Sequence, residues 1–150
     1  MRALVLYATI TGNNEDVADE IIKNFQSHGV EVTKEDIINA DPYDLQAATN
    51  DIVVVVPYTF DKGSLPDEAL DFYEDLAMVD LHGQIFGVAG SGDVFYGADF
   101  AKAVDKFEAQ FIKAGASQGA PSVRVNLSPN TTAKAELKQF TDTLIARVVK

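Results

Sequence analysis

Apolar runs alternate with amphipathic segments along the chain, and this alternation predicts its secondary structure. Residues 51–56 and 84–89 are almost unbroken apolar runs, which is typical of strands covered on both faces of a parallel sheet. Residues 30–33 alternate between apolar and polar side chains, which suits an edge strand. The predicted strands are residues 2–8, 30–37, 51–56, 84–91 and 123–127. The predicted helices are residues 13–27, 66–78, 98–114 and 132–149, with a short helix or turn at 42–48.

Strands that alternate with helices predict an α/β fold, a doubly wound sheet of about five parallel strands. No repeat or linker interrupts the order, so we expect one domain over residues 1–150. Gly29 is suited to a left-handed cap at the end of the first helix. Ligands of such sheets bind beyond the carboxyl ends of the strands. Three loops are therefore candidates for a binding site, at residues 9–14, 57–65 and 90–100.

Composition narrows the function. The chain has 150 residues, 47% of them hydrophobic, and no cysteine, which excludes disulfides and thiolate catalysis. No apolar run reaches the roughly 18 residues of a membrane span, and no signal peptide is evident, so we expect a cytoplasmic protein without membrane association. The net charge is −11, and residues 1–100 carry 19 acidic and four basic side chains. This balance disfavours nucleic-acid binding and favours encounters with basic partners.

The first loop has the features of a neutral phosphate site. Thr9 and Thr11 supply hydroxyl donors, Asn14 supplies an amide donor, and the main-chain amides of residues 10–14 lie at a helix N-terminus. Gly12 lets the main chain approach closely. The loop lacks the lysine of a Walker motif, so it suits a terminal monophosphate that is anchored and not transferred. The alternative is a polar strand-to-helix turn with an asparagine cap.

The other two loops offer flat apolar surfaces. Phe60, which follows Tyr58 and Thr59, is a candidate wall for an aromatic ligand, although it also suits a plug on the core. In the third loop, Gly90 and Gly92 expose main-chain groups to a ring edge, and Phe95 and Tyr96 offer a second flat surface. Together the loops suit a flat heterocycle that carries a phosphorylated tail.

Two other classes fit poorly. A receiver domain of a response regulator has this architecture but needs acidic residues after the first and third strands, where Thr9 and Pro57 stand. A serine hydrolase needs a GxSxG motif, which the sequence around Ser91 does not match. His28 and His82 lie in connections, so we expect no metal site.

At these loops the sequence resembles the flavodoxins in their short form. The resemblance is carried by residues 5–13 with Ala18 and Ile21, by residues 58–60 and by residues 90–97, in the family's order. It implies a flavodoxin-like doubly wound five-stranded parallel sheet, strand order 2-1-3-4-5, with helices on both faces. It also implies a low-potential electron carrier that binds FMN non-covalently and shuttles single electrons between redox proteins, without a substrate of its own.

The resemblance implies a role for each loop residue. The phosphate would be held by Thr9, Ile10, Thr11, Gly12, Asn13 and Asn14. The flavin and ribityl chain would be contacted by Tyr58, Thr59, Phe60, Asp61, Ser91, Gly92, Asp93, Tyr96 and Phe100, with Phe60 and Tyr96 on the two ring faces and main-chain groups of residues 91–93 at the pyrimidine edge.

The resemblance also implies the partners, which are flavodoxin or ferredoxin reductases and oxidoreductases with basic docking faces. Residues 61–99 carry nine acids and one lysine beside the predicted ring site, and we expect a monomer.

The sequence departs from the family at two places. Asn14 replaces a common threonine, although its amide can still donate to a phosphate oxygen. Phe60 and Asp61 replace a common Trp-Gly pair, whose glycine peptide turns over to accept a hydrogen bond from the reduced ring. A Cβ costs about 1 kcal/mol or more in the backbone regions that this turn visits, so we predict that Asp61→Gly raises the first one-electron potential in a redox titration. An FMN-dependent quinone or disulfide reductase, or a degenerate relative that binds FMN weakly, is the alternative.

Overall fold

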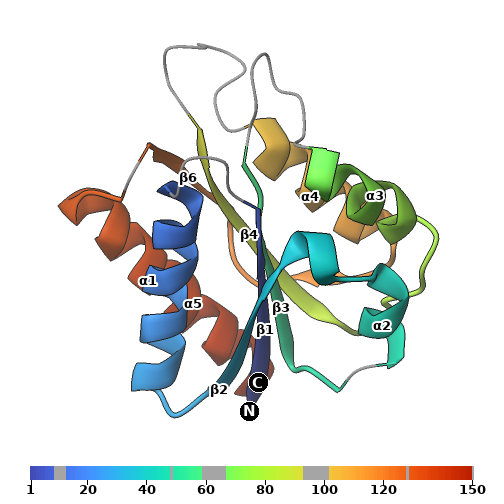
Figure 1. The fold of residues 1–150 in the computed structure, drawn as a ribbon. Coiled ribbons are helices and arrows are strands. Elements are labelled where there is room, and N and C mark those ends of the chain that lie inside the picture. Colours follow the sequence, from blue (N-terminus) through green and yellow to red (C-terminus); the bar gives the residue numbers. More distant parts are fainter. Residues whose placement is uncertain (9–12, 48, 59–66, 93–101, 128, 150) are drawn as a thin grey trace.

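The computed structural model contains one parallel sheet with helices on both faces (Figure 1). It describes residues 1–8, 13–47, 49–58, 67–92, 102–127 and 129–149. The described strands are β1 (Arg2–Tyr7), β2 (Glu31–Asp36), β3 (Ile52–Val56), β4 (Ile85–Gly92), β5 (Ser117–Gln118) and β6 (Val123–Asn126). The described helices are α1 (Asn13–Ser27), the 3-10 turn η1 (Ile37–Asn39), α2 (Pro42–Ala47), α3 (Asp67–Leu76), α4 (Lys102–Lys113) and α5 (Thr131–Val149).

The strand order is β2-β1-β3-β4-β5, and β6 also pairs with β4. Val5 in β1 lies opposite Lys34 of β2 on one side and Val54 of β3 on the other. The predicted order 2-1-3-4-5 and the doubly wound class are therefore confirmed. Since β1 is flanked by β2 and β3, the winding reverses between β1 and β3, which is where sheets of this type bind ligands.

The fifth position of the sheet differs from the prediction. A single strand was predicted at 123–127, but two short segments fill this position: β5 pairs with the start of β4, and β6 pairs with its end. Between them, the four residues 119–122 pass opposite the two residues 87 and 88 of β4. The main-chain N–H of Gly119 still donates to the carbonyl of Phe86 at 2.8 Å. Pro121 has no N–H to donate, so a regular ladder cannot continue through this segment.

Two apolar layers cover the sheet, one on each face. All residues of β3 are buried, and they alternate between the layers: Val53 and Val55 face α3 and α4, whereas Ile52, Val54 and Val56 face α1 and α5. Figure 1 shows these helix pairs on opposite sides of the sheet. This burial confirms that the unbroken apolar runs belong to strands covered on both faces.

The first helix ends as the sequence predicted. Gly29 has a φ of +74°, and its N–H donates to the carbonyl of Gln26, while Val30 N–H donates to the carbonyl of Phe25. This pair of bonds is the Schellman arrangement, which needs the left-handed residue that glycine supplies without steric cost. Among the helices that the structure describes, none is long and apolar enough to cross a lipid bilayer.

Candidate functional site

The carboxyl ends of β1, β3 and β4 converge at one edge of the sheet. One residue beyond β1, the N–H of Ala8 donates to the carbonyl of Val56 at 3.0 Å. Beyond β3, Tyr58 forms a parallel bridge with Ser91 of β4. The three candidate loops of the sequence analysis leave the sheet from these ends, so the fold brings their starting points together.

Close contact between the ends of β3 and β4 depends on Gly90. A Cβ at this position would lie 2.3 Å from the carbonyl oxygen of Pro57 and 3.1 Å from a methyl group of Val104. A main-chain oxygen cannot move aside as a flexible side chain can. The strand that leads into the third loop, β4, therefore approaches the residue after β3 at a distance that a side chain at position 90 would prevent.

Asn14 joins all three strand ends. Its side chain is fully buried in the first turn of α1. The Nδ2 group donates to the carbonyls of Ala8 and Val56, and Oδ1 accepts from the N–H of Ser91 at 2.9 Å. Both N–H donors of the amide are thus used inside the protein, which sequence reasoning did not anticipate.

Five of the predicted site residues fall within the described part of the chain. Asn13 begins α1, Asn14 lies beneath the strand ends, Tyr58 is partly buried, and Ser91 and Gly92 are the last two residues of β4. Outside the described residues lie Thr9, Ile10, Thr11, Gly12, Thr59, Phe60, Asp61, Asp93, Tyr96 and Phe100.

Main-chain groups of the last β4 residues already have partners. The N–H of Ser91 bonds to Asn14, and the carbonyl of Gly92 accepts from the N–H of Leu127 at 2.8 Å. The hydroxyl of Ser91 behaves differently, because its Oγ is buried and has no hydrogen-bond partner. A buried polar atom without a partner costs free energy, so this oxygen marks a place where a ligand group would be favourable.

A lysine that sequence reasoning missed lies beside the first turns of α1 and the end of β1. Lys34 of β2 bonds Glu15 at 2.6 Å and Asp19 at 2.9 Å, both on α1, and its Nζ lies 5.1 Å from the ring centre of Tyr7. The hydrogen bond to Glu15 is the largest of the effects that raise the pKa of Lys34. Lys34 thereby offsets part of the acidic charge that follows the loop. The available signal was its position two residues after Val32 on an alternating edge strand, which places Lys34 on the sheet face that α1 covers.

Tyr7, the last residue of β1, shares this environment. Burial is the main cause that raises the pKa of its phenol, followed by the charge of Glu15. Lys34 acts in the opposite direction and lowers it. The neutral phenol is therefore the form that the folded protein favours.

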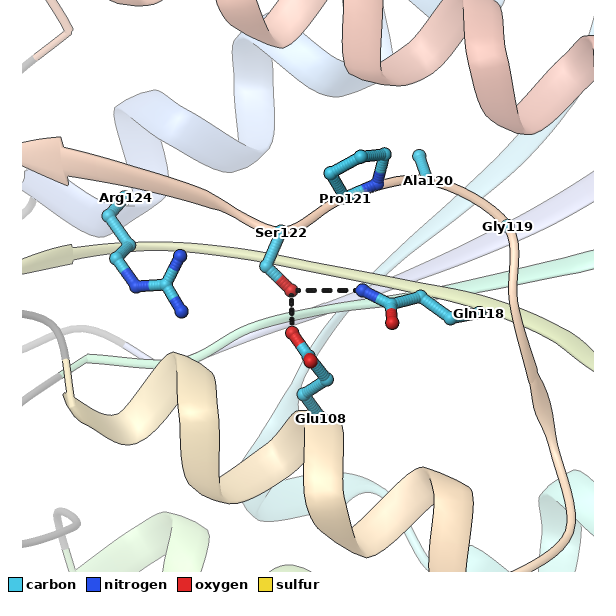
Figure 2. A pocket seen from close by; sticks show the side chains of 7 residues that line it. All are labelled: Glu108, Gln118, Gly119, Ala120, Pro121, Ser122 and Arg124. Carbon is cyan, nitrogen blue, oxygen red and sulfur yellow. Dashed lines mark hydrogen bonds between the residues drawn. The ribbon is translucent and has the colours of Figure 1, made fainter.

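A separate hollow of about 560 Å³ lies between α4 and the connection from β5 to β6 (Figure 2). Ser122 Oγ donates to Glu108 Oε2 at 2.5 Å and accepts from Gln118 Nε2 at 3.5 Å, as Figure 2 shows. Arg124 pairs with Asp105. These polar groups satisfy one another, so the hollow lacks the unsatisfied group found at the carboxyl edge. Within the described residues, no cluster of His, Cys, Asp or Glu is arranged to hold a metal ion.

Comparison with known proteins decides the family. The flavodoxin family model matches residues 5–140. The chain belongs to the flavodoxin family. It is 38% identical to probable flavodoxin 2 of Bacillus subtilis over 140 residues, which cover 93% of this chain and 91% of that protein.

Solved flavodoxin structures agree over nearly the whole chain. A short-chain flavodoxin associated with a bacterial microcompartment superposes with a TM-score of 0.94 at 43% identity and covers 99% of both chains. The Streptococcus pneumoniae flavodoxin superposes with a TM-score of 0.92 at 40% identity, covering 98% of this chain and 99% of that one. This chain is accordingly a flavodoxin, an FMN-binding electron carrier without a substrate of its own.

Flavodoxin-like domains also occur inside larger redox proteins. The flavoprotein component of a sulfite reductase from Zymomonas mobilis is 29% identical over 148 residues, which cover 96% of this chain but 24% of that protein. Fusion of such a domain to a reductase indicates that redox proteins are the partners of this flavodoxin.

Residues at the carboxyl edge fit FMN. The unpartnered Ser91 Oγ matches a cofactor rich in hydroxyl and phosphate oxygens. The start of α1 has free main-chain N–H groups that can donate to an anion. In sequence, residues 9–14 add two threonine hydroxyls and contain no acidic side chain that would repel a phosphate.

Proposed function

We propose that FMN binds across the carboxyl ends of β1, β3 and β4. Residues 9–13 would hold the phosphate, residues 58–61 the ribityl side and the inner ring face, and residues 91–93 with Tyr96 and Phe100 the rest of the ring. The observation that carries this proposal is the buried, unpartnered Ser91 Oγ at the edge where the three loops begin. When bound, FMN supplies one-electron transfer.

The protein's own contribution is binding and orientation. Main-chain N–H groups at the start of α1 would donate to the phosphate, with the helix dipole behind them. The close approach of Pro57 to Gly90 holds together the ends of β3 and β4, from which the second and third loops leave. The planar ring would then lie between aromatic side chains that exclude water from its faces.

The test is an FMN titration of the apoprotein followed by quenching of flavin fluorescence. We expect saturation at micromolar FMN or below. Phe60→Ala and Tyr96→Ala should each raise the dissociation constant about tenfold or more, because aromatic stacking on a base contributes about 1–3 kcal/mol. Tyr43→Ala is the matched control, since Tyr43 lies on α2 and is half-exposed. No binding by the native apoprotein, or equal loss in all three variants, would refute the proposed site.

We also propose that the acidic outer face of α3 docks a basic redox partner. Asp71, Glu74 and Asp75 are exposed on this helix, and residues 67–92 contain no lysine or arginine. Because helices of this fold run back from the carboxyl edge, α3 begins beside the predicted ring site. Complementary charge raises association rates and orients the partner. We propose that the protein works as a monomer in the cytoplasm, which leaves this face open.

The docking proposal is tested with a charge-reversed pair, Glu74→Lys with Asp75→Lys. The control pair, Glu31→Lys with Glu136→Lys, makes the same change in net charge on β2 and α5. At low ionic strength, we expect the α3 pair to slow electron transfer to a small basic cytochrome by about tenfold, and the control pair to have a much smaller effect. Equal slowing by both pairs would show that only net charge matters, and this would refute docking on α3.

The proposed monomeric state is tested separately by sedimentation velocity, which should show a single species with the mass of one chain.

A further inference from the structure

We propose that Asn14 is a positioning residue, which holds the three strand ends of the FMN site in register before the cofactor arrives. This inference builds on the proposed site. It assigns the side chain to the protein framework, whereas the sequence suggested that it donates directly to the phosphate.

The hydrogen-bonding capacity of the Asn14 amide supports this assignment. The group has two N–H donors, and these bond the carbonyls of Ala8 and Val56. Its oxygen accepts the N–H of Ser91 at 2.9 Å. The side chain is fully buried, so no donor is left to reach a phosphate without breaking one of these two hydrogen bonds.

The three partners lie at the roots of three different loops. Ala8 directly precedes the first loop, Val56 ends β3, and Ser91 lies one residue before the end of β4. Asn14 itself lies in the first turn of α1, the helix whose N-terminus faces the phosphate position. One side chain therefore fixes the helix start relative to all three strand ends, a geometry that the binding site would otherwise have to acquire on binding.

This role also accounts for the departure from the family's threonine. A threonine hydroxyl has one donor, so it cannot bond the Ala8 and Val56 carbonyls at the same time, as the Asn14 amide does. Its side chain is also shorter by one atom than the Asn14 amide. A framework role therefore predicts that threonine is the worse residue here, whereas a phosphate-donor role predicts that threonine is at least as good.

The experiment compares FMN with riboflavin, which lacks the phosphate, in the native protein and in Asn14→Thr. If Asn14 positions the strand ends, the variant should raise the dissociation constants of both flavins by a similar factor of about ten, equivalent to about 1.4 kcal/mol. If Asn14 binds the phosphate, riboflavin affinity should stay unchanged in the variant, and this result would overturn the proposal. Unchanged affinity for both flavins would overturn it as well.

Hydrogen exchange of the apoprotein gives a second readout. In Asn14→Thr the amide of Ser91 should exchange at least tenfold faster, because its acceptor is lost. The amide of Gly119, bonded to Phe86 at the other end of β4, reports any global loss of stability. Thr141→Val is the matched control variant, since Thr141 is equally buried but its hydroxyl donates to the Leu137 carbonyl within its own helix. Equal acceleration at Ser91 and Gly119 would show a merely global effect and overturn the proposal.

A measurement on the native apoprotein keeps the proposal testable if the variant does not fold. The side-chain NH₂ protons of Asn14 should exchange slowly in NMR spectra recorded without flavin, and they should remain protected after FMN is added. Exchange at the rate of a free amide would overturn the proposal. If the native protein bound neither flavin, the proposed site would fail, and these exchange rates would still decide the role of Asn14 in the framework.

Discussion

Gly90 lies where the ends of β3 and β4 come closest together. In Gly90→Ala the new methyl group would meet the Pro57 carbonyl, which is part of the main chain, at 2.3 Å. The strands must separate at this point, and we expect a loss of about 1–3 kcal/mol in the free energy of unfolding together with a measurable loss of FMN affinity. Urea unfolding of the apoprotein and a flavin titration measure the two effects.

Gly87 on the same strand supplies the control for that prediction. Its added methyl group would meet side-chain atoms of Phe140 and Leu144 on α5, the nearest at 2.7 Å. Gly87→Ala should therefore also lower stability, but it should leave the strand ends and FMN affinity unchanged. If Gly90→Ala bound FMN as the native protein does, the close approach at Pro57 would have no role in the site.

Tyr7 and Lys34 give a prediction about titration. Burial and then Glu15 raise the pKa of the Tyr7 phenol above 10.0, and Lys34 partly opposes them. Lys34→Met should therefore raise the pKa of Tyr7 further. Absorbance of the apoprotein at alkaline pH follows the phenolate, and subtraction of the same titration for Tyr7→Phe isolates this residue. A lower Tyr7 pKa in Lys34→Met would contradict the assigned contacts.

Stability at high pH should change in the same variant. The pKa of Lys34 is raised in the folded protein, chiefly by its bond to Glu15, so its contribution is complete below its unfolded value of 10.5 and is lost as the pH rises through the folded value. The Lys34 side chain is about one-third exposed, which limits this contribution to about 1 kcal/mol or less. Thermal melting should show Lys34→Met less stable than the native protein at pH 8, and this difference should shrink as the pH rises above 10.5.

At the scale of elements, α5 begins with a side-chain cap. Asn130 Oδ1 accepts the N–H of Ala133 at 2.9 Å, and the Asn130 carbonyl accepts from Lys134 in the first helical bond. Asn130→Ala should cost about 1 kcal/mol of unfolding free energy. Asn130→Asp keeps the acceptor and adds a charge favourable at a helix N-terminus, so it should retain native stability. Urea denaturation compares them, and equal midpoints for the alanine and aspartate variants would rule out the cap.

Most of the elements could be predicted because their apolar residues follow helical or strand periods. Val53 and Val54 point to opposite faces, yet both are buried, so an unbroken run correctly indicated a central strand. The split of the fifth strand could not be predicted. Ser117 and Gln118 are polar and form a strand of only two residues, β5. This strand is recognised by its pairing with the first residues of β4. No local pattern encodes that pairing.

At the scale of the whole molecule, topology predicted the sheet edge at which we propose the site, but it did not predict the contacts of each residue. Three loops were identified because parallel strands end together where the winding reverses. Asn14 was assigned to the phosphate because a polar residue in a loop is typical of a ligand donor. In the structure, its hydrogen-bond partners come from the ends of three strands that are far apart in sequence, with Ser91 the most distant. Burial of a polar side chain by such convergence is a tertiary effect, which the sequence pattern does not carry.

Net charge leads to a prediction about salt. The protein carries a charge of −11, its first loop contains no lysine or arginine, and Lys34 is engaged by Glu15 and Asp19. FMN is a dianion near neutral pH, so long-range electrostatics should oppose its binding, in contrast to phosphate sites built on basic side chains. Raising the ionic strength from 0.01 to 0.15 M shortens the screening length from about 30 Å to about 8 Å. The FMN dissociation constant should therefore fall severalfold over this range.

Riboflavin is the control for this prediction, because it is uncharged and its affinity should hardly respond to salt. Titrations of both flavins in sodium chloride at fixed pH separate the long-range repulsion from any general effect of salt on the protein. If FMN binding instead weakened as salt was added, a cationic side chain would have to contact the phosphate. Main-chain donors and hydroxyls would then be insufficient to explain the site, and if Lys34 were the cation, it would have to leave its two carboxylate partners on α1.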